Sequence, residues 1–314
     1  MKKISMTMAG AAALALVGLT ASPALAVGGP TLPADDKLYV VECDPTDAVS
    51  LQLFGIDPVN GTPTTIGTGN PGESNCAWQG AQKPGTDWFY YFPQDRYLQR
   101  INLTTGVNEV IGHLSFNGSP YNGGYSLAIG PDGTAYVLSY DDLYKVDLST
   151  AALEYLSSPN FYDEYSGYPY AFAYDFTTEK FYVVEDGDGA LYELTPSTGD
   201  KVELSYNSDY AVYSISFDAN GDMWANGNGD YVSKTTIANF GNSAAWQDSP
   251  DIVIGQGTLY SESIWVSPKF PDVQPDAPTL ANTGIDAAAF VALASLLSIA
   301  GASIIVARRR ASRA

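Results

Sequence analysis

A repeat of about 45 residues runs through the middle of this chain and limits the folds that it can adopt. Four segments each combine a strand pattern, a polar turn and a second strand that closes on Ile or Leu before Gly or Ser: LQLFGIDPVNGTPTTIG, LQRINLTTGVNEVIG, LYKVDLSTAALEYLS and LYELTPSTGDKVELS. A fifth, VSKTTIANFGNSAAWQDSPDIVIG, carries an insertion. Equivalent residues lie 45, 45, 48 and 43 positions apart, at Ile56, Ile101, Val146, Leu194 and Ile237.

A second hairpin pattern precedes each repeat after the first, as in LAIGPDGTAYVLSY. Each unit is therefore expected to form four strands, which is the composition of a propeller blade. The first unit starts directly with its second strand, KLYVVEC, and an isolated strand pattern, SESIWVSP, follows the fifth. We expect an all-β propeller of five four-stranded blades, closed by pairing of the N- and C-terminal strands. Six blades are the alternative, with the last strand opening a further blade.

The repeats resemble extracellular propellers of the YVTN or NHL type. Their blades carry an aromatic-Val strand, a D-x-x-T-G turn and a closing Ile-Gly, and LYKVDLSTAALEYLS and LYELTPSTGDKVELS are close to this consensus. The resemblance covers about 230 residues. It describes how blades are built and implies no chemistry.

The first 26 residues have the order of charges and apolar residues that is typical of a secretory signal peptide. Two lysines precede an apolar stretch that is too short to cross a bilayer, and small residues follow at Ala24 and Ala26. This order predicts an N-terminal signal helix with cleavage after Ala26. The mature protein is therefore expected outside the cell.

The C-terminal segment combines three elements: the pentapeptide LANTG, an uncharged apolar run at residues 287–307 and a basic tail at 308–314. The run is long enough to form a transmembrane helix, and its arginine-rich flank is expected to stay cytoplasmic. Residues 269–279 precede the pentapeptide and form a Pro-rich spacer pattern. A GPI signal is the alternative, but that pattern does not include a terminal arginine cluster.

This arrangement resembles the cell-wall sorting signal of Gram-positive surface proteins. Leu280, Ala281, Thr283 and Gly284 match the L-A-x-T-G variant, in which Ala replaces the usual proline. The resemblance implies a class E-type sortase that cleaves after Thr283 and joins the new carboxyl end to peptidoglycan. The membrane would then hold the chain only through the C-terminal span, before sorting. The predicted organisation is a signal peptide (1–26), an N-terminal lead (27–36), a propeller (37–268), the spacer (269–279), the sorting motif (280–284), the span and the tail.

The charge of the part between signal and sorting motif is strongly negative. Six of the 15 lysines and arginines lie in the two end segments, as does only one of the 35 acids, so residues 27–283 carry a net charge near −25. Binding to nucleic acid requires a basic surface, so we expect no nucleic-acid partner.

Cys43 and Cys76 are the only cysteines. In an exported chain a pair of cysteines is more typical of a disulfide than of a metal or redox site. Both are expected at the same face of adjacent blades, where a bridge would tie the closing blade to its neighbour. A reactive thiol is the alternative, although no histidine lies adjacent in the sequence.

The sequence contains few residues that could form a catalytic site. His113 is the single histidine, and a Ser-His-Asp triad would have to be built around it. A propeller glycosidase would need paired carboxylates in the central channel. The expected channel strands carry acids only at their ends, at Asp175 and Asp218, in turns. We therefore expect no enzyme, with a glycosidase as the enzymatic alternative.

The connections between blades, and those between second and third strands, are expected to emerge on one face. They are rich in Tyr, Asn and Asp, a composition suited to recognition of sugars or proteins. The candidate ligand residues are Tyr121, Tyr162, Tyr165, Tyr168 and Tyr210. No cofactor is expected, except that a calcium ion could be held by Asp44, Asp141, Asp186 and Asp188. The spacing in DANGD, at 218–222, also fits a calcium loop, but a simple Asx-Gly turn is preferred.

These observations together predict a protein of the Gram-positive cell wall whose propeller head binds an unknown extracellular ligand, either a glycan or a protein. A structural wall or coat protein without a specific ligand is the alternative. The glycosidase is the third candidate.

Overall fold

The chain divides into two compact units, Met1–Lys269 and Phe270–Ala314. A computed structural model describes parts of the first unit: residues 36–43, 51–70, 79–93, 96–124, 126–161, 169–185, 189–207, 212–227, 231–243, 252–253 and 263–267. Several predicted features lie outside these residues: the signal peptide with Ala24 and Ala26, the spacer, the sorting residues Leu280, Ala281, Thr283 and Gly284, the apolar run and the basic tail. Within the described residues no helix has the length and apolar character to cross a membrane.

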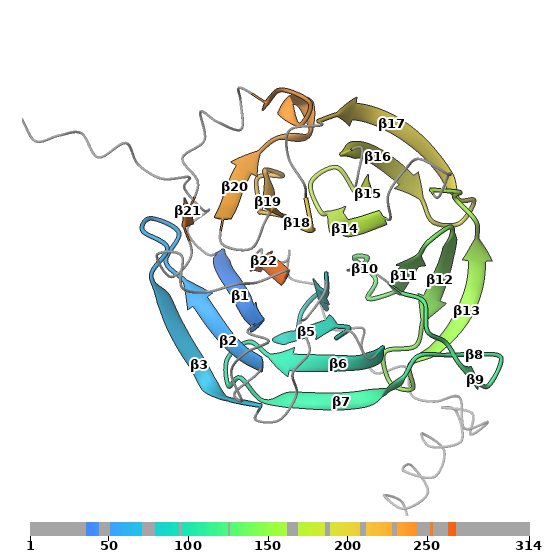
Figure 1. The fold of residues 1–314 in the computed structure, drawn as a ribbon, viewed down its shortest axis with the longest axis horizontal. Helices are drawn as coiled ribbons and strands as arrows, with labels where there is room; N and C mark the ends of the chain where they lie inside the picture. Colours follow the sequence, from blue (N-terminus) through green and yellow to red (C-terminus); the bar gives the residue numbers. More distant parts are fainter. Residues whose placement is uncertain are drawn as a thin grey trace, which may run out of the picture. The chain divides into compact units, whose positions relative to one another are not determined.

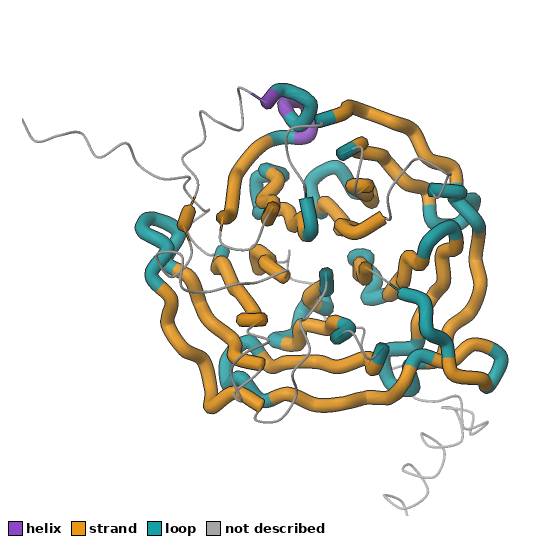
Figure 2. The backbone as a smooth tube through the Cα atoms, viewed as in Figure 1, coloured by secondary structure: helices purple, strands orange, loops and turns teal. Residues whose placement is uncertain are grey.

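Five sheets, each with four antiparallel blade strands, stand around a central axis like the blades of a propeller, as the repeat predicts (Figure 1). Each sheet runs from an innermost strand at the axis to an outermost strand at the rim (Figure 2). From the centre outward, the strands of blades 1 and 2 are β22 (Ser263–Ser267), β1 (Lys37–Cys43), β2 (Leu51–Ile56), β3 (Pro63–Asn70); and β4 (Ala81–Gln82), β5 (Trp88–Tyr91), β6 (Tyr97–Asn102), β7 (Asn108–His113).

Blades 3 to 5 follow in the same sense around the ring. Blade 5 has the insertion predicted from the sequence, with a short 3-10 helix, Ile237–Asn239, between its two outer strands. The strands are β10 (Ser126–Ile129), β11 (Ala135–Ser139), β12 (Asp142–Val146), β13 (Ala152–Ser157); β14 (Pro169–Asp175), β15 (Lys180–Glu185), β16 (Ala190–Thr195), β17 (Asp200–Tyr206); and β18 (Ser214–Phe217), β19 (Met223–Gly227), β20 (Tyr231–Thr235), β21 (Ile252–Val253).

The two ends of the repeat region meet in blade 1. Strand β22 pairs with β1 in five antiparallel positions, from Lys37↔Ser267 to Val41↔Ser263. The predicted closure by the terminal strands is therefore confirmed, and the six-bladed alternative is wrong. Trp265 of β22 is 2% exposed, and its ring stacks on Phe89 of blade 2 at a centroid distance of 3.5 Å. The closing strand thus also joins blades 1 and 2.

One connection departs from the prediction. The segment between β7 and β10 was expected to be a loop, but part of it forms the hairpin β8 (Ser115–Phe116) and β9 (Ser119–Pro120). Its turn residues, Asn117 and Gly118, both have positive φ angles, 52° and 74°, as a tight hairpin turn requires. Strand β8 pairs in parallel with the first two residues of β13, Ala152 and Leu153, so this hairpin covers the beginning of the outer edge of blade 3. These two positions are thereby closed to pairing with other chains.

The Gly or Ser that ends the repeat of one blade contacts the Thr-Gly turn of the next blade. This close contact explains why small residues recur at both positions. Gly67 lies so close to the turn of blade 2 that an added Cβ would be 2.6 Å from Thr105 O and 2.9 Å from Gly106 Cα. The same contact recurs between Ser157 of blade 3 and Gly199 of blade 4, where an added Cβ would lie 2.9 Å from Ser157 Cβ. The repeat sequence therefore encodes the docking of blades as well as their strands.

A side chain that the sequence did not single out connects the inner strands of two blades that are not neighbours. Gln79 precedes β4 of blade 2, is 2% exposed and reaches the inner strand of blade 5. Its amide donates a hydrogen bond to Ile215 O and accepts one from Ile215 N, each at 2.9 Å. Gln79 thus satisfies backbone groups of a strand edge two blades away, as a neighbouring strand would.

We predict that Gln79→Ala lowers the free energy of unfolding by about 1–3 kcal/mol, because the buried Ile215 N–H and C=O lose their partner. Gln82→Ala is the matched control. Its amide bonds only to Thr86 O within the same hairpin, and we expect a loss below about 1 kcal/mol. Equal losses in urea titrations of the two variants would contradict the role of Gln79 across the ring.

Candidate functional site

The propeller has two faces, which the antiparallel strands define. The upper face is where chains pass between blades and from second to third strands; the lower face carries the turns from first to second and from third to fourth strands. Lys37 and Ser267, at the two ends of the ring, are paired at the lower face. The chain therefore enters and leaves the propeller on the lower face.

Most residues of the predicted ligand face lie outside the described residues, namely Tyr162, Tyr165, Tyr168 and Tyr210, together with Asp44, Asp186 and Asp188. Cys76 lies outside them too, whereas the backbone of Cys43 ends β1. The disulfide and the calcium site thus remain predictions. Within the described part of the chain, no group of three or more His, Cys, Asp or Glu side chains is placed to hold a metal ion.

Tyr121 and Asp141 are described, and both lie at the upper face of blade 3. Tyr121 is only half exposed: its ring packs at 5.0 Å from that of Tyr144, and its hydroxyl donates a hydrogen bond to Ser139 Oγ at 2.9 Å. It packs against the blade on one side and stays half exposed, and its role in ligand binding stays a prediction. Asp141 is half exposed in the β11–β12 turn, and its backbone oxygen accepts a hydrogen bond from Ser158.

Three other tyrosines stand exposed at the upper face, and the sequence reading missed them. Tyr97 begins β6, Tyr140 lies in the β11–β12 turn and Tyr206 ends β17; their side chains are 39%, 43% and 50% exposed. Tyr140 has a φ of 42°, a backbone conformation that is unfavourable for a bulky residue. They belong to blades 2, 3 and 4, so the upper face carries aromatic side chains on successive blades.

His113 lies at the upper end of β7 and is held by its surroundings. Its Nδ1 is 2.8 Å from Leu114 O, and its ring packs edge-on against Tyr97 at 5.0 Å. In this arrangement the imidazole supports the Tyr97 ring at the face.

The acids at the ends of the inner strands lie in turns on the lower face, as predicted. Asp175 is fully buried and accepts hydrogen bonds from Thr177 and Thr178 at 2.7–3.1 Å. Asp218 accepts from the N–H groups of Asn220 and Asp222, at 2.9 and 3.0 Å. The DANGD segment is thus an Asx-Gly turn, and these carboxylates serve to hold hairpins.

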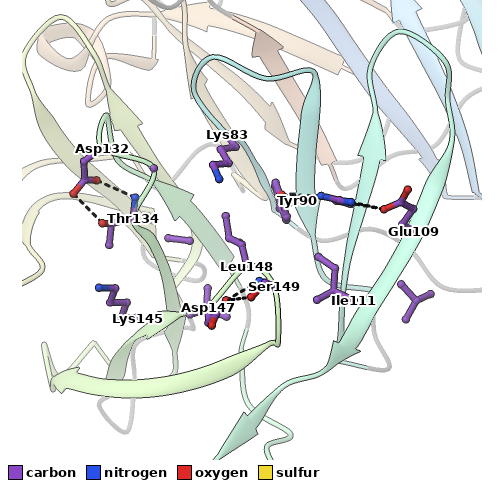
Figure 3. Close-up of a pocket in the computed structure, with 15 residues that line it drawn as sticks. Lys83, Tyr90, Glu109, Ile111, Asp132, Thr134, Lys145, Asp147, Leu148 and Ser149 are labelled. Atoms are coloured by element: carbon purple, nitrogen blue, oxygen red, sulfur yellow. Dashed lines mark hydrogen bonds and ion pairs between the residues drawn. The ribbon is translucent and has the colours of Figure 1, made fainter. Parts of the chain in front are cut away.

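The lower face carries a groove between blades 2 and 3 that the sequence did not reveal (Figure 3). Its volume is about 700 Å³. We call it the blade 2–3 groove. Its lining combines lysine, arginine, carboxylate and hydroxyl groups with a few aliphatic side chains: Lys83, Tyr90, Arg100, Glu109, Val110, Ile111, Asp132, Gly133, Thr134, Ala135, Lys145, Val146, Asp147, Leu148 and Ser149.

Several charges of the blade 2–3 groove are fixed by hydrogen bonds. Arg100 pairs with Glu109 and lies over the Trp88 ring, 4.2 Å from its centroid. The N–H of Thr134 holds the pKa of Asp132 below its usual range, and the hydroxyl of Ser149 does the same for Asp147. Both aspartates therefore stay ionised at neutral pH.

Comparisons with known proteins bear on the fold alone. No protein-family model and no curated protein matches the sequence. A chain from a nidogen–laminin complex is 10% identical, with a TM-score of 0.51 over 75% of this chain and 100% of the other. TolB from Acinetobacter baumannii is 16% identical, with a TM-score of 0.47 over 76% of this chain and 68% of that one.

An extracellular domain of a hybrid two-component system from B. thetaiotaomicron is 18% identical, with a TM-score of 0.37. That match covers 58% of this chain and 24% of the other, so it spans about a quarter of the longer protein. The strand topology identifies a five-bladed β-propeller, and the similarity to the nidogen–laminin chain supports this fold class.

Proposed function

We propose that this protein is displayed on the cell wall of a Gram-positive bacterium and that its propeller is a non-catalytic head that binds an extracellular ligand through the upper face. The observation that supports this most directly is the set of exposed tyrosines on that face, Tyr97, Tyr140 and Tyr206. A tyrosine ring offers rigid apolar area together with a hydroxyl that can donate or accept a hydrogen bond.

The position of the chain ends supports the same proposal. The chain leaves the propeller at Ser267 on the lower face, and the predicted sorting motif follows within 17 residues. Attachment through that segment would leave the upper face accessible to ligands. Class E-type sortase and peptidoglycan are the partners that the motif implies. A bridge between Cys43 and Cys76 and a calcium ion at the upper face belong to the same proposal.

Attachment is tested by Thr283→Ala, which removes the residue at which the sortase would cleave. We expect this variant to move from the wall fraction to the membrane fraction, with a loss of wall-bound protein of at least about tenfold, because the sortase thiol would attack the carbonyl of residue 283 and must bind that residue correctly. Asn282→Ala is the control, since it changes the variable position of the motif. Wall attachment of Thr283→Ala at the normal level would contradict the proposal.

Ligand binding is tested on intact cells. The triple variant Tyr97→Ala/Tyr140→Ala/Tyr206→Ala should lose adhesion to glycan-array and host-protein ligands that the unmodified protein recognises. Tyr155→Ala is the matched control, because Tyr155 is 48% exposed on β13 but lies on the outer wall of blade 3. Recognition of no ligand by the unmodified protein would favour the structural role instead.

A further inference from the structure

The blade 2–3 groove, on the face opposite to the exposed tyrosines, is lined by charged side chains of both signs, and its two lysines lack a salt bridge among the described residues. In the part of the chain that the structure describes, Lys83 and Lys145 form no ion pair. Both line this groove, although the chain has a net charge of −20. Cations are scarce in this protein, so two unpaired lysines in one groove indicate a site for negative charge on a ligand.

The two lysines come from different blades and approach the same space. Lys83 is half-buried after β4 of blade 2, and its side chain reaches the β10–β11 turn of blade 3, where an added Cβ at Gly133 would lie 3.5 Å from Lys83 Cε. Figure 3 shows it between Asp132 and Tyr90. Lys145 lies on β12, near enough to Asp132 to lower the pKa of that carboxyl further, after the larger effect of the Thr134 N–H.

The groove also carries negative charge that a ligand can use. Asp132 and Asp147 are exposed and ionised, and their turns hold them in place. Paired carboxylates and lysines across one groove complement a ligand that carries both an ammonium and carboxylates. Since the charges of the lining balance, a purely anionic polymer would meet repulsion from the aspartates.

The apolar part of the lining favours a peptide over a saccharide. Ile111 and Leu148 are half-buried side chains that form an aliphatic surface between the charged groups. The one aromatic residue of the lining, Tyr90, is only 3% exposed and offers no ring on which a sugar could stack. An aliphatic surface flanked by charges of both signs fits short side chains of a peptide.

We propose that the blade 2–3 groove binds a short zwitterionic peptide, whose carboxylates contact Lys83 and Lys145 and whose ammonium group contacts Asp132 and Asp147. This site is independent of the ligand face on the other side of the propeller.

The test is calorimetric titration of the full chain with the tripeptide Glu-Ala-Lys and with a version that is acetylated at both amino groups. We expect binding of the tripeptide. In Lys83→Gln and Lys145→Gln the affinity should fall about tenfold each, because each removes a charge-assisted hydrogen bond. Lys180→Gln is the matched control, since Lys180 is an exposed lysine of blade 4 that pairs with Glu193, and it should bind normally.

Substitution of the two aspartates tests the predicted contact with the ammonium group of the peptide. Asn can hold the same turns as Asp, so the double variant Asp132→Asn/Asp147→Asn should fold normally, bind the unmodified tripeptide about tenfold more weakly and bind the acetylated version without further loss. Three results would overturn the proposal: no binding of the tripeptide, binding that survives both lysine substitutions, or lysine-dependent binding of an oligo-uronate in place of the peptide. None of these three results would bear on adhesion through the upper-face tyrosines, which is tested separately.

Discussion

A chain that stops after residue 262 is expected to lose its cooperative unfolding transition, whereas a chain that stops after Lys269 keeps it. The shorter chain lacks β22, so β1 loses all five of its paired positions on that side. The buried Trp265 and Val266 are lost with it. Replacing a buried Trp by Ala alone costs about 3–5 kcal/mol, and a domain has about 5–15 kcal/mol of stability in total.

The measurement is urea unfolding followed by tyrosine and tryptophan fluorescence and by circular dichroism. We expect coincident transitions in the longer chain and a broad, non-coincident change in the shorter one. Trp265→Ala, in the longer chain, separates the effect of the ring stack on Phe89 from that of the strand, and should remain cooperative. If the shorter chain unfolded with an unchanged midpoint, closure by β22 would not stabilise the propeller.

Asp218→Ala is expected to lower the free energy of unfolding by about 3–5 kcal/mol, because it breaks a buried charged network. The Asp218 side chain is fully buried, accepts a hydrogen bond from Trp224 Nε1 at 3.0 Å and lies 3.5 Å from Lys234 Nζ. Without it, the buried indole N–H loses this acceptor, and Lys234 loses one of its two carboxylate contacts.

The control for this experiment is Asp222→Ala, which removes the more exposed partner of Lys234. This carboxylate is 28% exposed, and we expect a loss of about 1 kcal/mol or less. Similar losses for the two variants would contradict the role of Asp218 described above.

The architecture of the ring could be predicted because each blade has the same local sequence pattern of strands and turns. The spacing of closing residues gave the number of blades, and the incomplete first unit gave the closure by β22. The hairpin β8–β9 also had a local signal, the Asn117-Gly118 pair. Its parallel pairing with β13 depends on tertiary contacts that no repeat encodes, so the segment was taken for a loop.

The candidate sites were less predictable because they depend on packing between blades and on the exact ends of strands. Lys83 and Lys145 come from different blades, and their approach depends on how closely blade 2 packs against blade 3. The exposure of Tyr97, Tyr140 and Tyr206 depends on where each strand ends, to within a residue. Tyr121 was predicted as a ligand residue from its loop-like surroundings, and its contact with Tyr144, which leaves it half exposed, could not be seen in the sequence.

The position of β22 has a mechanical consequence. Any tension on the chain beyond Ser267 enters the ring through its innermost strand and runs along the axis of that strand. Its five pairs with β1 are then loaded in shear and must break together, whereas a strand pulled from the rim could be peeled away one pair at a time. The stack of Trp265 on Phe89 transfers part of this load to blade 2. The pairing of β22 with β1 therefore resists a pull on the C-terminal end of β22 more strongly than the pairing of a rim strand would.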